Sequence, residues 1–338
     1  MYDFTKSPIR ILDEKVLECF DHLNNDVCKF HEERMIKNGN NPLQWNIERQ
    51  LFSMPKTNGS EIYCSYASLD YLWCFCYTMF AYQELANEYL AIHPEGGMLP
   101  IDFKPYGSHI FSMMIQCNKI LSYQSKKVED FSEIDWPKDM VNPSNFTFDF
   151  ETNKIIGHVN SMYVRAATFW FLHEAAHIYF DHGKTIDITH KKFRNDEEER
   201  LYIEEQQNLQ IINEEKEADT LAMDLMFRSQ DVDNFFLLNN LYGALLAVLS
   251  SAFVCKISEN IKDPKHPLLP DRARLLIENA VSKGLPESDA ECFYHLCSQA
   301  FAMFLSQKNR VLDSYDAKDS SRNYFNRMED ILDEYITK

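Results

Sequence analysis

Apolar residues recur at intervals of three and four along most of the chain, which is the spacing of a helix with one buried face. The chain has only 9 glycines and 12 prolines in 338 residues, which argues against a β-rich fold with many turns. We therefore expect a mainly α protein (α+β) with a small sheet. The predicted helices span residues 7–37, 66–92, 111–123, 166–180, 196–228, 231–258, 270–283, 287–306 and 320–336.

One region departs from this helical pattern. Aromatic and polar residues alternate over Phe146–Phe150, and Ile155 and Ile156 follow a turn-like Glu151–Asn153. The alternation predicts a β-hairpin over residues 146–158. An edge strand there, beside the helix at 166–180, would hold an extended peptide by main-chain hydrogen bonds. An ordinary surface hairpin is the alternative.

The helix predicted at 166–180 contains the sequence HExxH, formed by His173, Glu174 and His177. Histidines four residues apart lie on one helix face, one turn from each other, so both imidazoles can reach one metal ion. Glu174 lies beside them and can act as the base for a metal-bound water, as in zinc peptidases. A structural histidine pair is the alternative. The apolar surroundings favour the metal site, because burying these side chains without a cation is costly.

A second polar group follows on the helix predicted at 196–228. Glu215 and Asp219 share one stripe of this helix with two alanines, which suits close approach to another helix. Glu215 is the candidate third metal ligand, and Asp219 can accept the spare ring N–H of a metal-bound histidine. Glu214 and Glu217 are competing ligands that we expect to face solvent. An ordinary charged surface helix is the alternative for this segment.

These motifs resemble those of gluzincin-type zinc metallopeptidases. The ExEADxxA sequence at 215–222 is similar to a segment of the HtpX-type heat-shock protease and the CaaX prenyl proteases, and His182 matches a histidine frequent in that group. Residues 266–272 resemble their HPxxxxR element. Since those relatives span membranes several times, the chain is more similar to the soluble bacterial peptidase family of the phage-exclusion protein Lit. The motifs cover about residues 155–280.

The resemblance implies a zincin-like core and a zinc-dependent endopeptidase that binds one Zn²⁺ per chain. His266 is the candidate oxyanion donor by likeness to the HPxxxxR element, with Arg272 second and Tyr179 and His182 weaker. The Lit family further implies phage defence by cleavage of a translation elongation factor. Two other functions stay open: a regulatory metallopeptidase of a repressor or toxin–antitoxin circuit, and an inactive, zinc-stabilised interaction protein. Retention of Glu174 argues against the last, because structural zinc needs no base.

Charge and cysteine content limit the binding partners and the cellular location that we expect. The net charge of −18, without a basic cluster, argues against direct nucleic-acid binding. Acidity favours either a basic protein partner or solubility alone. The nine cysteines are scattered without a C-x-x-C pair, which is typical of a reduced, cytoplasmic protein. The first residues show no apolar signal sequence. We therefore expect a cytoplasmic, bacterial protein whose oligomeric state the sequence leaves open.

The segment Asn234–Cys255 carries no charged residue and has an apolar stretch at 241–254, so a membrane span is one interpretation. Its asparagines and serines, and the lack of a second such segment, favour a buried helix behind the metal site instead.

The same patterns predict three regions. Residues 1–144 form a helical N-terminal region that shapes or regulates the cleft, ending at a polar, proline-bearing stretch at 126–144. Residues 145–285 form the zincin-like catalytic core. Residues 286–338 form C-terminal helices that pack on the core.

Overall fold

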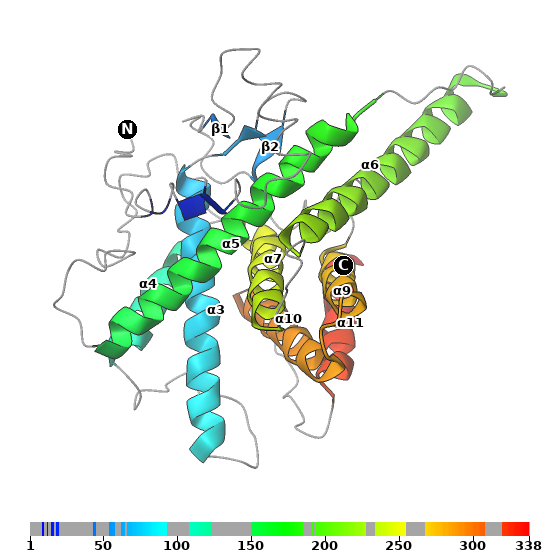
Figure 1. Ribbon diagram of the computed structural model, residues 1–338. Helices are drawn as coiled ribbons and strands as arrows, with labels where there is room; N and C mark the ends of the chain where they lie inside the picture. The colour runs from blue at the N-terminus through cyan, green and yellow to red at the C-terminus, as the bar shows by residue number, and fades with distance from the viewer. Residues whose placement is uncertain are drawn as a thin grey trace.

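The computed structural model describes residues 54–57, 62–64, 66–92, 108–122, 150–184, 193–227, 234–254, 268–307 and 320–337, with residues 43–44, 191 and a few isolated positions before residue 20. Helices dominate this part of the chain, which confirms the predicted mainly α fold. They are α3 (Tyr66–Ile92), α4 (Ser108–Ser122), α5 (Phe150–Phe180), α6 (Asp196–Met226), α7 (Asn234–Val254), α9 (Leu269–Ser282), α10 (Glu287–Gln307) and α11 (Ser321–Thr337) (Figure 1).

A small three-stranded sheet lies beside α5. Its strands are β1 (Leu43–Gln44), β2 (Lys56–Thr57) and β3 (Ile62–Tyr63), in the order β1-β3-β2. β3 runs parallel to β1 and antiparallel to β2. β2 is therefore an edge strand, and it packs against α5.

The hairpin predicted over residues 146–158 is wrong where the structure describes that region. Residues 150–158 form the first turns of α5, and residues 146–149 lie outside the described residues. Ile156, Val159 and Tyr163 are buried at helical spacing, so packing of one helix face decides the conformation here. The sheet exists, but residues 43–63 supply it.

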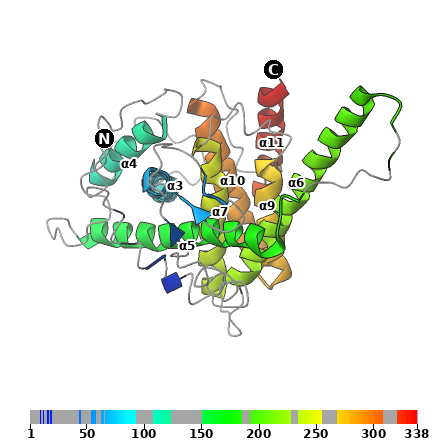
Figure 2. The same cartoon turned by 90° about the horizontal axis from the view of Figure 1, so that it is seen from above.

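α5 crosses α3, α6 and α7 and connects the two sides of the molecule (Figures 1 and 2). It meets α7 at Gly243, where a methyl group would lie 2.5 Å from Cβ of Arg165. Arg165 donates from Nε to Oδ1 of Asn240 at 3.2 Å, and Asn240 donates to the carbonyl of Met226 at 2.7 Å. The buried Asn240 side chain thus links α5, α7 and the end of α6.

α3 belongs to the same hydrophobic core as α5 and α7. The hydroxyl of Tyr71 lies 3.1 Å from the carbonyl of Leu121 in α4 and 2.7 Å from the carbonyl of Phe253 in α7. The indole of Trp73 donates to Oδ1 of Asn160 in α5 at 2.8 Å. All seven described cysteines are free, and five of them are buried.

Among the described residues, one helical segment, Asn234–Phe253, is long and apolar enough to cross a membrane. About two thirds of its most apolar window, 67%, is buried inside the protein. Length and composition alone are weak evidence, because core helices of globular proteins meet the same criterion. The packing of α7 against α3, α5, α9 and α10 accounts for its apolar sequence as that of a core helix.

Candidate metal centre

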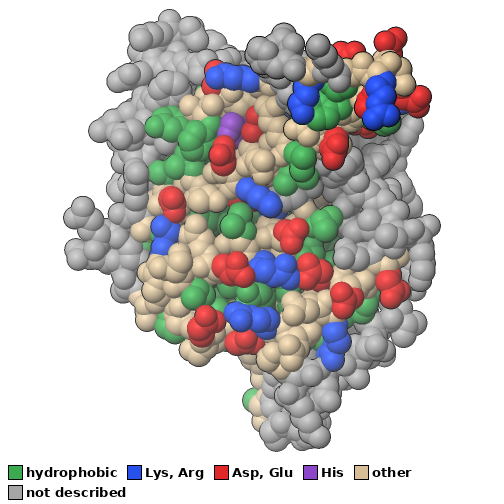
Figure 3. Space-filling model, turned by 90° about the vertical axis from the view of Figure 1, so that its right-hand side faces the viewer, with side chains coloured by type: hydrophobic (Ala, Val, Ile, Leu, Met, Phe, Trp, Pro, Cys, Tyr) green, Lys and Arg blue, Asp and Glu red, His purple; other side chains and the backbone are tan. Residues whose placement is uncertain are grey.

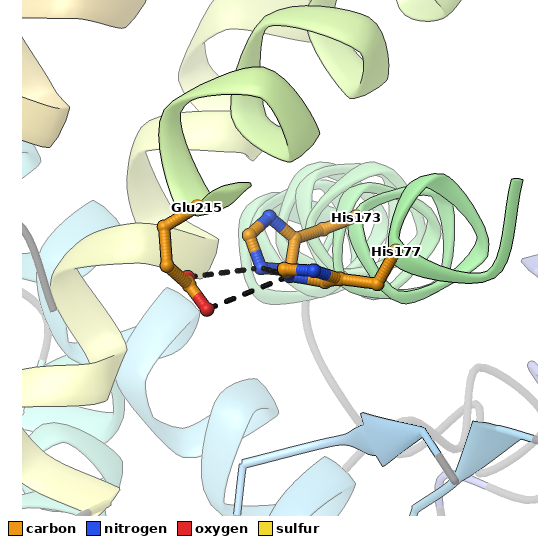
Figure 4. Close-up of side chains that lie close together, drawn as sticks. All are labelled: His173, His177 and Glu215. Atoms are coloured by element: carbon orange, nitrogen blue, oxygen red, sulfur yellow. Dashed lines mark hydrogen bonds and ion pairs between the residues drawn. The ribbon is translucent and has the colours of Figure 1, made fainter. Parts of the chain in front are cut away.

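Two neighbouring helices bring three potential metal ligands together. α5 carries His173 and His177 one turn apart, and α6 packs alongside with Glu215 facing them (Figure 4). The two Nε2 atoms lie 3.1 Å apart. Nε2 of His173 is 3.3 Å from Oε2 of Glu215, and Nε2 of His177 is 3.5 Å from Oε1 of the same carboxylate.

These separations fit a zinc ion. Four tetrahedral bonds of about 2.05 Å would place ligand atoms about 3.3 Å apart, close to all three distances. Two imidazole nitrogens and a carboxylate oxygen form a donor set that zinc prefers. Within the described residues, no other cluster of histidine, cysteine, aspartate and glutamate side chains has donor atoms so close together. His173, His177 and Glu215 therefore fit this metal in both chemistry and spacing.

Asp219, one turn after Glu215, lies behind His173. Its Oδ1 is 2.9 Å from Nδ1 of His173, the distance of a hydrogen bond, although the angle departs from the in-line direction. Asp219 is fully buried and accepts two bonds of 2.7 Å from Nε and Nη2 of Arg272 in α9. Burial alone would raise the pKa of Asp219, but the Arg272 charge and the His173 contact hold it below its ordinary value.

The centre strongly favours positive charge. Burial works against protonation of His173, yet its contacts with Asp219 and Glu215 outweigh burial and raise its pKa to about 10. Burial, together with the neighbouring His173 charge, lowers the pKa of His177 to about 3. Positive charge on His173 is thus stabilised by the surrounding carboxylates, and a metal cation bound here would be stabilised by the same carboxylates.

Glu174 lies next to these ligands and is 9% exposed. Burial raises its pKa to about 8, and the nearby charges of His173 and Arg272 oppose that rise. The backbone N–H of Thr57 in β2 also donates to this carboxylate. Thr57 is not recognisable from the sequence, because a strand of two residues is too short to give a periodic signal.

The chain reverses direction at the end of α5. The N–H of Asp181 donates to the carbonyl of Ile178 at 3.2 Å, and that of His182 donates to the carbonyl of His177 at 3.1 Å. Asp181 has a φ of 57°, in the left-handed region that is uncommon for a residue other than glycine. This reversal returns the His182 ring to the His177 ring, where their Nδ1 atoms are 2.8 Å apart.

The acids that we expected to face solvent contact this reversed segment. Oε1 of Glu214 accepts from the N–H of Gly183 at 3.1 Å. Glu217 is 64% exposed, but its Oε2 lies 3.2 Å from Nε2 of His182. Within the described residues, neither acid lies with the cluster of His173, His177 and Glu215.

The remaining predicted residues lie further from the centre or outside the described part of the chain. Arg272 directs two donors to Asp219. Tyr179 is 41% exposed and contacts the ring of Phe180. His158 is exposed, as expected. His266 and the other expected surface histidine, His190, lie outside the described residues.

The side of the molecule shown in Figure 3 mixes both signs of charge. Acidic and basic side chains are interspersed over the described part of this face, with small groups of hydrophobic side chains between them. The excess of acids in the sequence is therefore accompanied, on this face, by basic side chains close by.

A protein-family model described as Peptidase U49 matches residues 62–291, more than half of the chain. The protein belongs to this family, which is that of Lit-type peptidases, and is therefore assigned to the peptidases. The match extends from β3 into α10, beyond the motif region of residues 155–280, so α3 and α4 also belong to the family's pattern. No curated protein and no solved structure matches the chain significantly.

Proposed function

We propose that this peptidase is a zinc-dependent endopeptidase whose metal is held by His173, His177 and Glu215. The observation that supports this most directly is the spacing of the donor atoms at the junction of α5 and α6: the two Nε2 atoms lie 3.1 Å apart, and each has one Glu215 oxygen at 3.3 or 3.5 Å. A structural histidine pair would not need a carboxylate positioned against both Nε2 atoms.

In the proposed reaction, each residue of the site has a separate role. A zinc ion bound here would activate water and polarise the carbonyl of the peptide bond. Glu174, adjacent to the ligands, would accept the proton of the attacking water and deliver it to the leaving amine. Asp219 would hold His173 with Nε2 directed at the metal, and Arg272 would hold Asp219. His266 remains our proposed donor to the developing oxyanion.

The edge strand β2 is the proposed support for the substrate. It packs against α5, and the Thr57 N–H reaches the Glu174 carboxylate. An extended peptide lying along this edge would be held by main-chain hydrogen bonds with its scissile bond near Glu174. We therefore propose that residues 56–57, instead of residues 146–158, form the edge strand that binds the substrate.

Metal analysis tests the ligand set. After dialysis, the wild-type protein should retain about one zinc ion per chain. His173→Ala and Glu215→Ala should lose it, whereas Glu204→Ala, an exposed acid of the same helix, should retain it. Full zinc retention by His173→Ala would show that the ligands are wrongly assigned.

A second variant separates chemistry from binding. Glu174→Gln keeps the size of the side chain but cannot take the proton of water at neutral pH, so cleavage should cease while zinc and fold persist. Undiminished turnover of this variant would assign the base to another residue.

For the biological role, we propose cleavage of one cytoplasmic protein, a translation elongation factor, in bacterial phage defence. The support is membership of the Lit-type family together with the packing of α3 against α5, the helix that carries His173 and His177; an N-terminal region placed there would limit which proteins reach the centre. Comparing cellular proteins and growth between bacteria that express wild type and Glu174→Gln, before and after phage infection, would reveal the target. Digestion of casein without any preferred cellular target would contradict narrow specificity.

A further inference from the structure

We propose that His182 is a positioning residue for His177, and that Glu217 completes the same hydrogen-bonded chain. This inference rests on the proposed metal site, in which Nε2 of His177 is a ligand. It extends that site to two residues that contact no reacting atom.

The tautomers of both rings follow from the geometry. Nε2 of His177 faces Nε2 of His173 and the Glu215 carboxylate, so as a ligand it carries no proton. The proton of the neutral His177 ring is then on Nδ1, which lies 2.8 Å from Nδ1 of His182. His182 must accept there, so its own proton is on Nε2, which lies 3.2 Å from Oε2 of Glu217. Each donor thus meets an acceptor, in the order His177, His182, Glu217.

The backbone is arranged to hold His182 in this place. The bond from the His182 N–H to the carbonyl of His177 closes the end of α5, as in a Schellman motif. That motif needs Asp181 at a φ of 57°, where a side chain costs energy. The His182 ring stacks on Phe180, with ring centroids 5.3 Å apart and planes 20° from parallel, and its side chain is only 8% exposed. The ring is thus fixed on three sides.

The two metal-binding histidines would then have different supports. His173 is backed by the fully buried Asp219, which Arg272 neutralises. His177 is backed by a neutral imidazole and, behind it, the mostly exposed carboxylate of Glu217. Since solvent screens Glu217, removal of the His182 contact should weaken the metal less than removal of the Asp219 contact does.

The test compares two replacements of His182 in the full-length protein. His182→Phe keeps a ring that can stack on Phe180 but has no acceptor. His182→Asn places an amide oxygen close to the position of Nδ1 and can accept the proton of His177. We expect zinc affinity, measured by competition with a chelator, to fall about tenfold in His182→Phe and to return near the wild-type value in His182→Asn.

Two further readouts separate positioning from folding. The visible absorption of the cobalt(II)-loaded protein should change in His182→Phe and match wild type in His182→Asn, because it reports the ligand geometry directly. The urea midpoint of the metal-free protein should not follow the same order. If His182→Phe does not fold, Glu217→Ala replaces it as the test. The zinc affinity of Glu217→Ala should be measurably lower than that of wild type, by up to about tenfold.

The inference is overturned if His182→Phe binds zinc as tightly as wild type with an unchanged cobalt spectrum, or if His182→Asn is as weak as His182→Phe. In the Glu217→Ala experiment, unchanged zinc affinity overturns it. The proposed function fails separately, and this inference with it, if the wild-type protein binds no zinc.

Discussion

The crossing of α5 and α7 leaves no space for a side chain at Gly243. A methyl group there would lie 2.5 Å from Cβ of Arg165 and 3.1 Å from two backbone atoms of α5. Carbon atoms normally pack at about 3.5–4.0 Å, so Gly243→Ala requires the two helices to separate by up to about 1 Å. The obstructing atoms belong to the backbone and the first side-chain carbon, so a change of rotamer cannot relieve the contact.

The size of the effect follows from two opposing contributions. Alanine stabilises a helix interior by about 1 kcal/mol relative to glycine. Overpacking of a tight core contact costs about 1–3 kcal/mol, and a contact of this kind belongs at the upper end. The net expectation is a loss of about 2 kcal/mol in the free energy of unfolding.

Gly157→Ala is the matched control. Gly157 lies in the interior of α5 and is exposed, and a methyl group there would meet no atom within 4 Å. This variant should gain about 0.5–1 kcal/mol from reduced backbone entropy in the unfolded chain. Urea denaturation followed by circular dichroism should therefore move the two midpoints in opposite directions at constant slope. A higher midpoint for Gly243→Ala would refute the close contact.

Three other predictions follow from the centre and the core. Asp219→Asn should lower zinc affinity about 10- to 100-fold in equilibrium dialysis, and an unchanged affinity would exclude Asp219 from supporting His173. Arg272→Met leaves the buried Asp219 carboxylate without its cation and should cost about 3–5 kcal/mol in urea denaturation, whereas Arg274→Met, whose ion pair is more exposed, should cost about 1 kcal/mol or less; equal costs would contradict the burial argument. Burial lowers the pKa of His295, so below about pH 6.5 the unfolded chain binds a proton that the folded one does not, and the protein becomes less stable as the pH decreases. His295→Gln should reduce the difference between the urea midpoints at pH 7 and pH 5.5. An unchanged difference would contradict this prediction.

Long helices were predictable from the sequence because proline-free segments of 21 to 31 residues exceed the length of an ordinary strand. The predicted segment 66–92 matches α3, and the helices predicted at 196–228 and 231–258 agree with α6 and α7 over residues 196–226 and 234–254. A small sheet was expected, but its position at residues 43–63 was not predictable, since two-residue strands show no alternation. The short aromatic alternation at residues 146–150 predicts a hairpin, whereas in the structure the helical spacing of the buried Ile156 and Val159 decides the conformation at the start of α5.

At the site, the spacing of HExxH and ExEAD predicted which side chains share a face within each helix. Residues four apart on a helix have a fixed relation, so His173 could be paired with His177, and Glu215 with Asp219, without knowing the fold. The expectation that the two pairs meet came from the likeness of the motifs to those of gluzincin-type peptidases. Thr57 and the pairing of His182 with Glu217 could not be found in this way. The first depends on a strand that is distant in sequence, and the second on the left-handed turn at Asp181.

All buried residues of α6 lie at or after Glu215, and the part of α6 before them extends away from the other helices (Figures 1 and 2). An inserted residue turns everything beyond it by about 100° around the helix axis. Within residues 197–208, such an insertion would turn only the projecting end, whereas one after Gln210 would move Glu214 or Glu215 relative to α5. Differences in length among members of the family should therefore collect in the first half of α6, which is also the place to attach a reporter without disturbing the centre.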